Sequence, residues 1–172
     1  MLPFDEKGVT NEFVGELVNR VCKPGYFGGV YAADEFKESF LASEKRKGWI
    51  INLNPRMKKE NGHFICVLQE HGDLVYIDPV GLPCVTEPLR SVLTKTGKNI
   101  YFNTTQVQDL TSICCGFFSA LFLIYFSKKN RIFKMKFDSV DLKKNDQLCF
   151  SYLKKLVELE KTEISHILEN VM

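Results

Sequence analysis

The run QDLTSICCGFF, residues 108–118, places a cysteine at the start of a strongly apolar segment. If Cys115 begins a helix, its sulfur lies beside unpaired backbone N–H groups and the positive end of the helix dipole, and both favour the nucleophilic thiolate. Gly116 lets substrate or backbone approach closely. Gln108, seven residues before Cys115, can supply a side-chain amide as an oxyanion donor beside the Cys115 N–H. The segment therefore predicts nucleophilic attack on a carbonyl.

A base and an acid occur earlier in the chain. His63 opens one strand-like run and Asp78 ends the next. If the two runs pair as a hairpin around residues 70–73, their outer ends lie side by side, and Asp78 can orient His63 as a general base. His71, in the predicted turn, and His166, in a charged C-terminal segment, lack a plausible acid partner. The sequence therefore predicts a Cys–His–Asp triad.

Each of these residues has an ordinary explanation when it is taken alone. A cysteine leading an apolar helix is more often inert core than nucleophile. A histidine at a strand edge is usually structural, and an aspartate before proline is usually a turn residue. The prediction of catalysis rests on the order and spacing of the four residues together.

The elements that must position these residues form an α+β pattern, with a small central mixed sheet flanked by helices. No Pro/Gly/Ser-rich linker divides the 172 residues, which are 45% hydrophobic, so a single domain over residues 1–172 is expected. Residues 25–31 are interpreted as an irregular, glycine-loosened segment. Strands are predicted at 49–53, 63–68, 74–78 and 99–103, and helices at 11–21, 34–45, 87–95, from Cys115 onward and at 145–171.

The six cysteines include no C-x-x-C pair and follow no secretory signal, so free thiols in a reducing compartment are expected rather than a zinc site. The cysteines other than Cys115 are interpreted as small core residues, and Trp49 and Phe64 as core or site-wall aromatics. The longest apolar run, residues 113–126, is 14 residues long and too short to span a bilayer. No membrane association is expected.

The formal net charge is only +2, but lysines and arginines gather in short clusters. These clusters are either solvated surface or a face that binds a nucleic-acid backbone without reading its sequence. They lie at residues 45–47, 56–59, 128–136, 143–144 and 154–155.

From about Val18 to Ile124 the chain resembles the adenain-type maturation proteases of adenoviruses, which have relatives in virophages and polinton-like elements. Residues 25–31, GYFGGVY, resemble the family's P-Y-F-L-G-T-Y segment. Residues 62–64 match its His-Trp, with Phe in place of Trp, and residues 76–81 match its acid-Pro-Phe-Gly, with Asp in place of Glu. Gln108 and the CGFF run from Cys115 match its Gln, six residues, Cys-Gly-Leu-Phe.

The resemblance implies a papain-like fold with the catalytic order His63, Asp78, Gln108, Cys115. It implies cleavage after or near Gly in viral precursor proteins, chiefly capsid components, by a monomer in the virion or the infected cell. The resemblance also implies two possible activators, a viral peptide and DNA. The family's activating peptide forms a disulfide about eleven residues before the oxyanion Gln, but residues 97–100 here read GKNI, without a cysteine. The sequence itself requires no cofactor, and non-covalent activation stays open.

Two alternatives to a maturation protease remain. Proteases of ubiquitin-like modifiers share the clan and the catalytic order, but they usually carry Asp before the nucleophile and Trp after the His. Cys114 and Phe64 fit neither feature. A non-catalytic relative that binds DNA or belongs to the virion is the other alternative, and the four filled catalytic positions argue against it.

Overall fold

Five strands form one mixed sheet whose spatial order, β1-β2-β3-β4-β5, follows the chain. The computed structural model describes residues 9–58, 62–128 and 135–169, with side chains up to residue 161. The antiparallel strands β2, β3 and β4 form the centre, and β1 and β5 pair in parallel at the two edges. The strands are β1 (Phe27–Ala32), β2 (Lys47–Asn52), β3 (Phe64–Glu70), β4 (Asp73–Ile77) and β5 (Ile100–Phe102).

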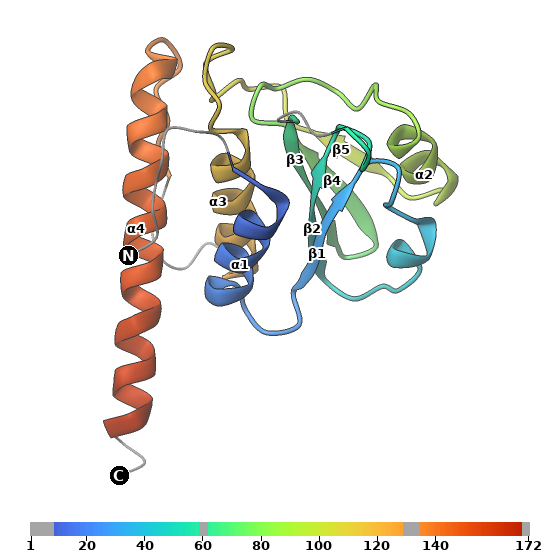
Figure 1. Cartoon of the computed structure of the whole chain (residues 1–172). Helices are drawn as coiled ribbons and strands as arrows, with labels where there is room; N and C mark the ends of the chain where they lie inside the picture. The colour runs from blue at the N-terminus through green and yellow to red at the C-terminus, as the bar shows by residue number, and fades with distance from the viewer. Residues whose placement is uncertain (1–8, 59–61, 129–134, 170–172) are drawn as a thin grey trace.

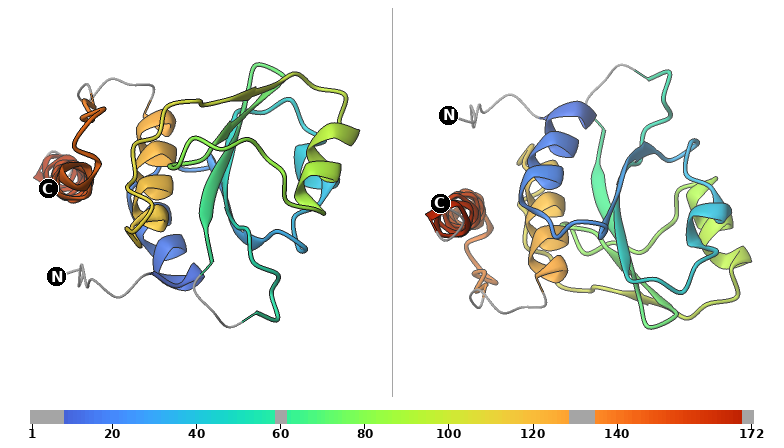
Figure 2. Two further views of the ribbon diagram at one scale, coloured as in Figure 1. Left: turned by 90° about the horizontal axis from the view of Figure 1, so that it is seen from above. Right: turned by 90° about the horizontal axis from the view of Figure 1, so that it is seen from below.

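Helices cover both faces of this sheet, as Figure 1 shows. One face carries α1 and α3, with α4 packed outside them, and the other face carries α2 and the short 3₁₀ helix η1, as the views along the layers in Figure 2 show. This is the predicted α+β architecture of a small mixed sheet flanked by helices. The helices are α1 (Asn11–Val21), η1 (Glu38–Leu41), α2 (Leu89–Lys95), α3 (Cys115–Ser127) and α4 (Leu142–Glu169).

Alternation along β2 and β3 divides the apolar side chains between two cores. Ile50 and Cys66 face the α1–α3 side, whereas Trp49 and Ile51 face the α2 side. Helix α3 is apolar all round because β3, α1 and α4 surround it, and its residues from Cys115 to Ile124 are buried. The nucleophile candidate therefore stands at the end of the most buried helix of the described chain.

The predicted hairpin is confirmed. Strands β3 and β4 pair from Glu70↔Asp73 to Cys66↔Ile77, and the tight turn uses positive φ angles at His71 (51°) and Gly72 (89°). Positive φ at both central residues is the twist that suits a two-residue hairpin. His63 and Asp78 lie just beyond the outer ends of these strands, as expected.

The interpretation of residues 25–31 as irregular was wrong, because most of them form β1, parallel to β2 with a bulge between Phe27 and Val30. Glycine weakens strand propensity, which hid the strand in the sequence. Glycine is required here for packing, because a Cβ on Gly28 would lie 2.1 Å from the Trp49 indole nitrogen. The glycine-rich strand thus admits a large aromatic ring.

Other predicted boundaries differ less. The helix predicted at 34–45 is only η1, while α2 begins at Leu89, after Pro88, rather than at residue 87. Helix α4 begins at Leu142, three residues before the predicted start at 145, and the predicted end at residue 171 lies outside the described residues. Over the described ranges, no helix combines the length and apolar character needed to cross a membrane.

The basic cluster at residues 45–47 is partly structural. The Arg46 guanidinium donates to the backbone carbonyls of Phe126 and Ser127, the last turn of α3, and pairs with Glu70. It also lies over the Tyr26 ring, 4.7 Å from the centroid. A cation at a helix C-terminus complements the carbonyls that have no partner within the helix. Part of the cluster at 128–136 lies outside the described residues.

Candidate active site

The outer end of the β3–β4 hairpin brings His63 and Asp78 into contact. The His63 Nε2 atom lies 2.7 Å from Asp78 Oδ1. Asp78 is 2% exposed, whereas the His63 side chain retains 31% of its surface. The arrangement is that of a buried acid orienting a partly accessible imidazole.

Asp78 is held in place by a residue that the sequence analysis treated only as the end of a strand. Asn103 Oδ1 accepts the Asp78 backbone N–H at 2.8 Å, and Asn103 Nδ2 donates to the Asp78 carbonyl at 2.7 Å. The Val80 backbone N–H donates to Asp78 Oδ1 at 2.7 Å. Because β5 runs parallel to β4 with Tyr76↔Phe102 in register, the residue after β5 meets the residue after β4. That pairing is the signal that could have identified Asn103.

Cys115 is the first residue of α3, and its sulfur faces the imidazole. Cys115 and His63 line the same cavity, and their interaction helps to raise the pKa of His63. The Nε2 atom of the ring is already paired with Asp78. The sulfur also lies 3.8 Å from the Gly62 carbonyl oxygen. Next to it, a Cβ on Gly116 would lie 2.1 Å from the Val9 side chain, so this position needs glycine for packing as well as for access.

The charge state of His63 is set by its two partners. Burial of the ring disfavours protonation, but the hydrogen bond to Asp78 and the interactions of the ring with Asp78 and Cys115 outweigh it and raise the pKa of His63 to about 9. Near neutral pH the imidazole is therefore protonated. A protonated imidazole beside the sulfur stabilises a thiolate there and holds a proton that it can donate.

Gln108, in the loop before α3, lines the same cavity as His63 and Cys115. Its backbone N–H donates to the Pro79 carbonyl at 3.0 Å, and its side-chain Nε2 donates to the Ser112 carbonyl at 2.8 Å. Its Oε1 is buried, with no hydrogen-bond partner among the described residues. One hydrogen of the amide NH₂ is thus used to fix the side chain, and the amide has a second hydrogen that another acceptor can use.

A buried amide on α4 supports this loop from behind. Asn145 is fully buried, and its Nδ2 donates to the carbonyls of Val107 and Asp138 at 2.8 Å each. Its Oδ1 accepts the Asp138 N–H at 2.7 Å. Asn145 therefore ties the residue before Gln108 to the start of α4. The sequence predicts a helix there but not this role, because nothing in the local pattern distinguishes Asn145 from other polar residues of the helix.

The four predicted residues are thus brought to one place: His63, Gln108 and Cys115 line a cavity of about 260 Å³, and Asp78 stands behind the histidine. Gly62 also lines this cavity, and residues 59–61 before it lie outside the described ranges. Over those ranges no group of three or more His, Cys, Asp or Glu side chains is arranged to hold a metal ion. The remaining walls are mostly apolar, formed by Val9, Phe64, Val80, Leu110 and Ile113.

Comparison with solved structures places this architecture among known folds. The central domain of the uncharacterized Lpg1148 protein from Legionella pneumophila matches with a TM-score of 0.51 and 14% identity, covering 86% of this chain and 97% of that domain. The SUMO protease Ulp1, with its catalytic cysteine oxidized to a sulfinic acid, matches with a TM-score of 0.50 and 12% identity, covering 91% of this chain and 81% of that one. The fold is papain-like.

Neither the scan against protein-family models nor the search of curated proteins gives a match. At these identities the structural likeness concerns the fold. It agrees with the predicted class of cysteine protease folds, and the narrower resemblance to adenain-type enzymes stays a prediction.

Proposed function

We propose that the chain is a single-domain cysteine endopeptidase in which Cys115 is the nucleophile. The observation that carries the proposal is that His63, paired with Asp78 at 2.7 Å, lines the same cavity as the Cys115 thiol at the start of α3. The papain-like fold, shared with a known protease, supports it.

The proposed reaction divides peptide hydrolysis into two steps. The Cys115 thiolate forms a bond to the substrate carbonyl carbon, and the electron pair of the C=O moves to oxygen. The Cys115 backbone N–H and the free N–H of Gln108 stabilise this oxyanion. His63 then protonates the leaving amine as the C–N bond breaks. Water attacks the thioester, His63 accepts its proton, and the acid product leaves with the thiolate restored.

For the substrate we propose viral precursor proteins, chiefly capsid components, cleaved at Gly-containing sites during assembly in the virion or infected cell. The small cavity and its glycine edge at Gly62 suit residues with little or no side chain next to the scissile bond. The resemblance of residues 25–31, 62–64, 76–81 and 108–118 to adenain-type enzymes supplies the rest of this proposal. Within it, the protein acts as a monomer, and a non-covalently bound viral peptide and DNA are candidate activators.

A protease of ubiquitin-like modifiers is the second candidate, because the matched Ulp1 is a SUMO protease. Both candidates use the same site and both tolerate Gly at the scissile bond, so they differ in the folded part of the substrate. The Phe64 and Cys114 positions, which depart from the usual pattern of modifier proteases, favour the first candidate.

Two measurements test the proposal. Cys114 is a matched internal control for alkylation, since it is 8% exposed like Cys115, and burial raises the pKa of its thiol. We expect iodoacetamide to modify Cys115 well before Cys114 at neutral pH, and substitution of His63 by Ala to remove the difference. Equal alkylation of both thiols would contradict the proposal.

The second measurement is a substrate panel of Gly-Gly-containing capsid-type peptides and of ubiquitin and SUMO conjugates, with Cys115→Ala as the control. Cleavage of the free peptides identifies an endopeptidase of the first kind. Cleavage restricted to the conjugates identifies a modifier protease, and cleavage of neither would overturn the assignment as a peptidase.

A further inference from the structure

A second, larger cavity adjoins the catalytic one, and we infer that it binds an extended segment of the substrate and selects a basic side chain through Glu12 and Glu16. This inference rests on the proposed peptidase function and specifies its substrate. We call the cavity the acidic groove. Its volume is about 850 Å³, and it runs between α1 and the edge formed by β1 and the end of β2.

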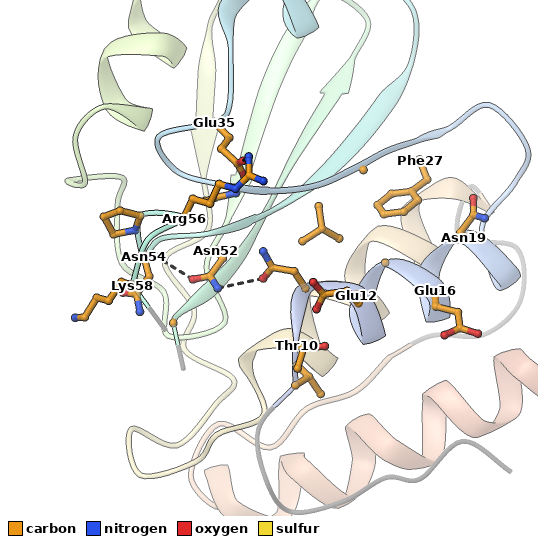
Figure 3. A pocket seen from close by; sticks show the side chains of 18 residues that line it. Thr10, Glu12, Glu16, Asn19, Phe27, Glu35, Asn52, Asn54, Arg56 and Lys58 are labelled. Carbon is orange, nitrogen blue, oxygen red and sulfur yellow. Dashed lines mark hydrogen bonds and ion pairs between the residues drawn. The ribbon is translucent and has the colours of Figure 1, made fainter. Parts of the chain in front are cut away.

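Figure 3 shows how the groove is built. Helix α1 forms one wall, with Glu12, Glu16 and Asn19 in sequence along it, and Phe27 of β1 lies near the far end. The opposite end is formed by Asn52, by Asn54 and by the segment that follows β2. An elongated hollow of this kind matches an extended peptide better than a compact small molecule, because an extended chain advances about 3.3 Å per residue.

The acidic groove and the catalytic cavity adjoin each other at two shared lining residues. Val9 and Gly62 line both of them, and the Gly62 carbonyl oxygen is 3.8 Å from the Cys115 sulfur. No side chain fits at Gly62, where a Cβ would lie 1.7 Å from Asn52 Oδ1. A peptide lying in the groove is therefore led past a glycine directly to the nucleophile.

The floor near this junction is a set of fixed amides. Asn52 Nδ2 donates to Asn11 Oδ1 at 3.1 Å, and Asn52 Oδ1 accepts the Asn54 backbone N–H at 3.0 Å. These contacts, drawn as dashed lines in Figure 3, hold both ends of the Asn52 side chain. Orientated amides offer hydrogen bonds to any peptide backbone without regard to its sequence, so sequence preference must come from the charged residues.

Some charged side chains of the acidic groove have an ion-pair partner and others do not. At the β2 end, Glu35 Oε1 pairs with the Arg56 guanidinium at 2.8 Å, and Lys58 is a second cation of that part of the lining. On α1, Glu12 accepts its own backbone N–H and the Thr10 hydroxyl, which lower the pKa of its carboxyl and keep it ionised. Neither Glu12 nor Glu16 forms an ion pair with any described residue, and Arg20, one turn beyond Glu16, is not part of the lining.

Glu12 and Glu16 stand four residues apart on one helix face, where like charges repel each other. A cation placed between them relieves that repulsion and gains attraction from both carboxylates. A lysine or arginine side chain of the substrate is the cation that a peptide in this groove can present.

The test compares internally quenched peptides that share a Gly-Gly core. One peptide is the core alone, and two series extend it by six residues on one side or the other, with a single Lys or a single Glu moved along the extension. We expect the wild-type protein to prefer Lys over Glu about fivefold in kcat/KM in one of the series, the size that exposed ion pairs give. The double variant Glu12→Gln/Glu16→Gln should reduce this ratio to nearly one, and Glu16→Gln alone, which leaves the start of α1 intact, should reduce it about twofold.

Glu38→Gln is the matched control, because Glu38 is exposed on η1 and lines neither cavity; its Lys-to-Glu ratio should equal that of the wild type. A wild-type ratio of one in both series, or a ratio that survives the double variant, overturns the inference while leaving the peptidase in place. If no peptide is cleaved, anisotropy of labelled Lys and Glu peptides on Cys115→Ala decides separately. Tighter binding of the Lys peptide that is lost with Glu12→Gln/Glu16→Gln supports the groove without the peptidase, and equal binding overturns it.

Discussion

The catalytic cavity and the acidic groove share a boundary at Val9 and Gly62 but are built in opposite ways. In the catalytic cavity short hydrogen bonds fix the reactive residues. Asn103 holds the Asp78 backbone, the Val80 N–H holds the Asp78 carboxylate, and the Ser112 carbonyl holds the Gln108 side chain. In the acidic groove the amides are fixed, but Glu16 is exposed and has no ion-pair partner among the described residues.

This difference shows that a catalytic site and a recognition site need different arrangements of their polar groups. Chemistry needs one geometry, so the groups around Cys115 are arranged before a substrate arrives. Recognition of a charged side chain needs partners that are still available, so the α1 carboxylates stay unpaired. Substitutions in the catalytic cavity should therefore lower turnover of every substrate, whereas those in the groove should change only the choice among extended substrates.

The largest effect is expected for His63→Ala. Without the imidazole, the thiolate loses its partner and the leaving amine loses its proton donor, so kcat/KM should fall by about 10³-fold or more for short and long peptides alike. His71→Asn is the matched control, since His71 is exposed in the β3–β4 turn and Asn tolerates its positive φ. Peptide cleavage assays measure both variants. Turnover by His63→Ala within tenfold of the wild type would refute the assignment of the base.

Gln108→Ala should have the next largest effect. Removing one oxyanion donor typically lowers kcat by about 10²–10³-fold, and the loss should fall on kcat rather than KM because the donor acts on charge that develops during the reaction. Gln147→Ala, at an exposed position on α4, is the control for loss of a glutamine elsewhere. A loss confined to KM would show that Gln108 binds substrate without stabilising the oxyanion.

Asn103→Ala should have a smaller effect that is visible in the pH profile. The pKa of His63, about 9, lies above its ordinary value of 6.5, so the protonated ring stabilises the fold fully below pH 6.5, and this contribution is lost as pH rises through about 9. Activity should fall over the same pH range, which forms the alkaline limb of the pH–activity profile. Loosening Asp78 should lower kcat/KM about tenfold or less and move the limb to lower pH. A smaller kcat/KM with an unmoved limb would mean that Asn103 has only a structural role.

Much of the fold followed from the sequence because its strongest signals are local. Alternation and turn chemistry predicted the β3–β4 hairpin, and the length of the apolar run predicted α3. Strand β1 was missed because its two adjacent glycines, at positions 28 and 29, lower strand propensity. The reason for glycine is the Trp49 ring, which is a tertiary contact that no local pattern contains.

The candidate site likewise contains residues that local sequence patterns predict and residues whose roles depend on tertiary contacts. His63, Asp78, Gln108 and Cys115 were predicted from order and flanking residues, and the structure brings these four together. The roles of Asn103 and Asn145 were not predicted, because Asn103 meets Asp78 across parallel strands and Asn145, on α4, meets the Val107 carbonyl 38 residues earlier in the chain. The acidic groove was also not predicted, since its walls come from α1 and β1, and the pairing of β1 with β2 was unknown.

The buried Asn145 side chain has a mechanical consequence. A single amide group joins the carbonyl next to Gln108 to the turn that opens α4, so the last helix is braced against the loop that completes the oxyanion site. Displacing the first turn of α4 would break the Val107 contact and release that loop. Helix α4 therefore supports the catalytic site, although none of its described side chains lines the cavity around Cys115.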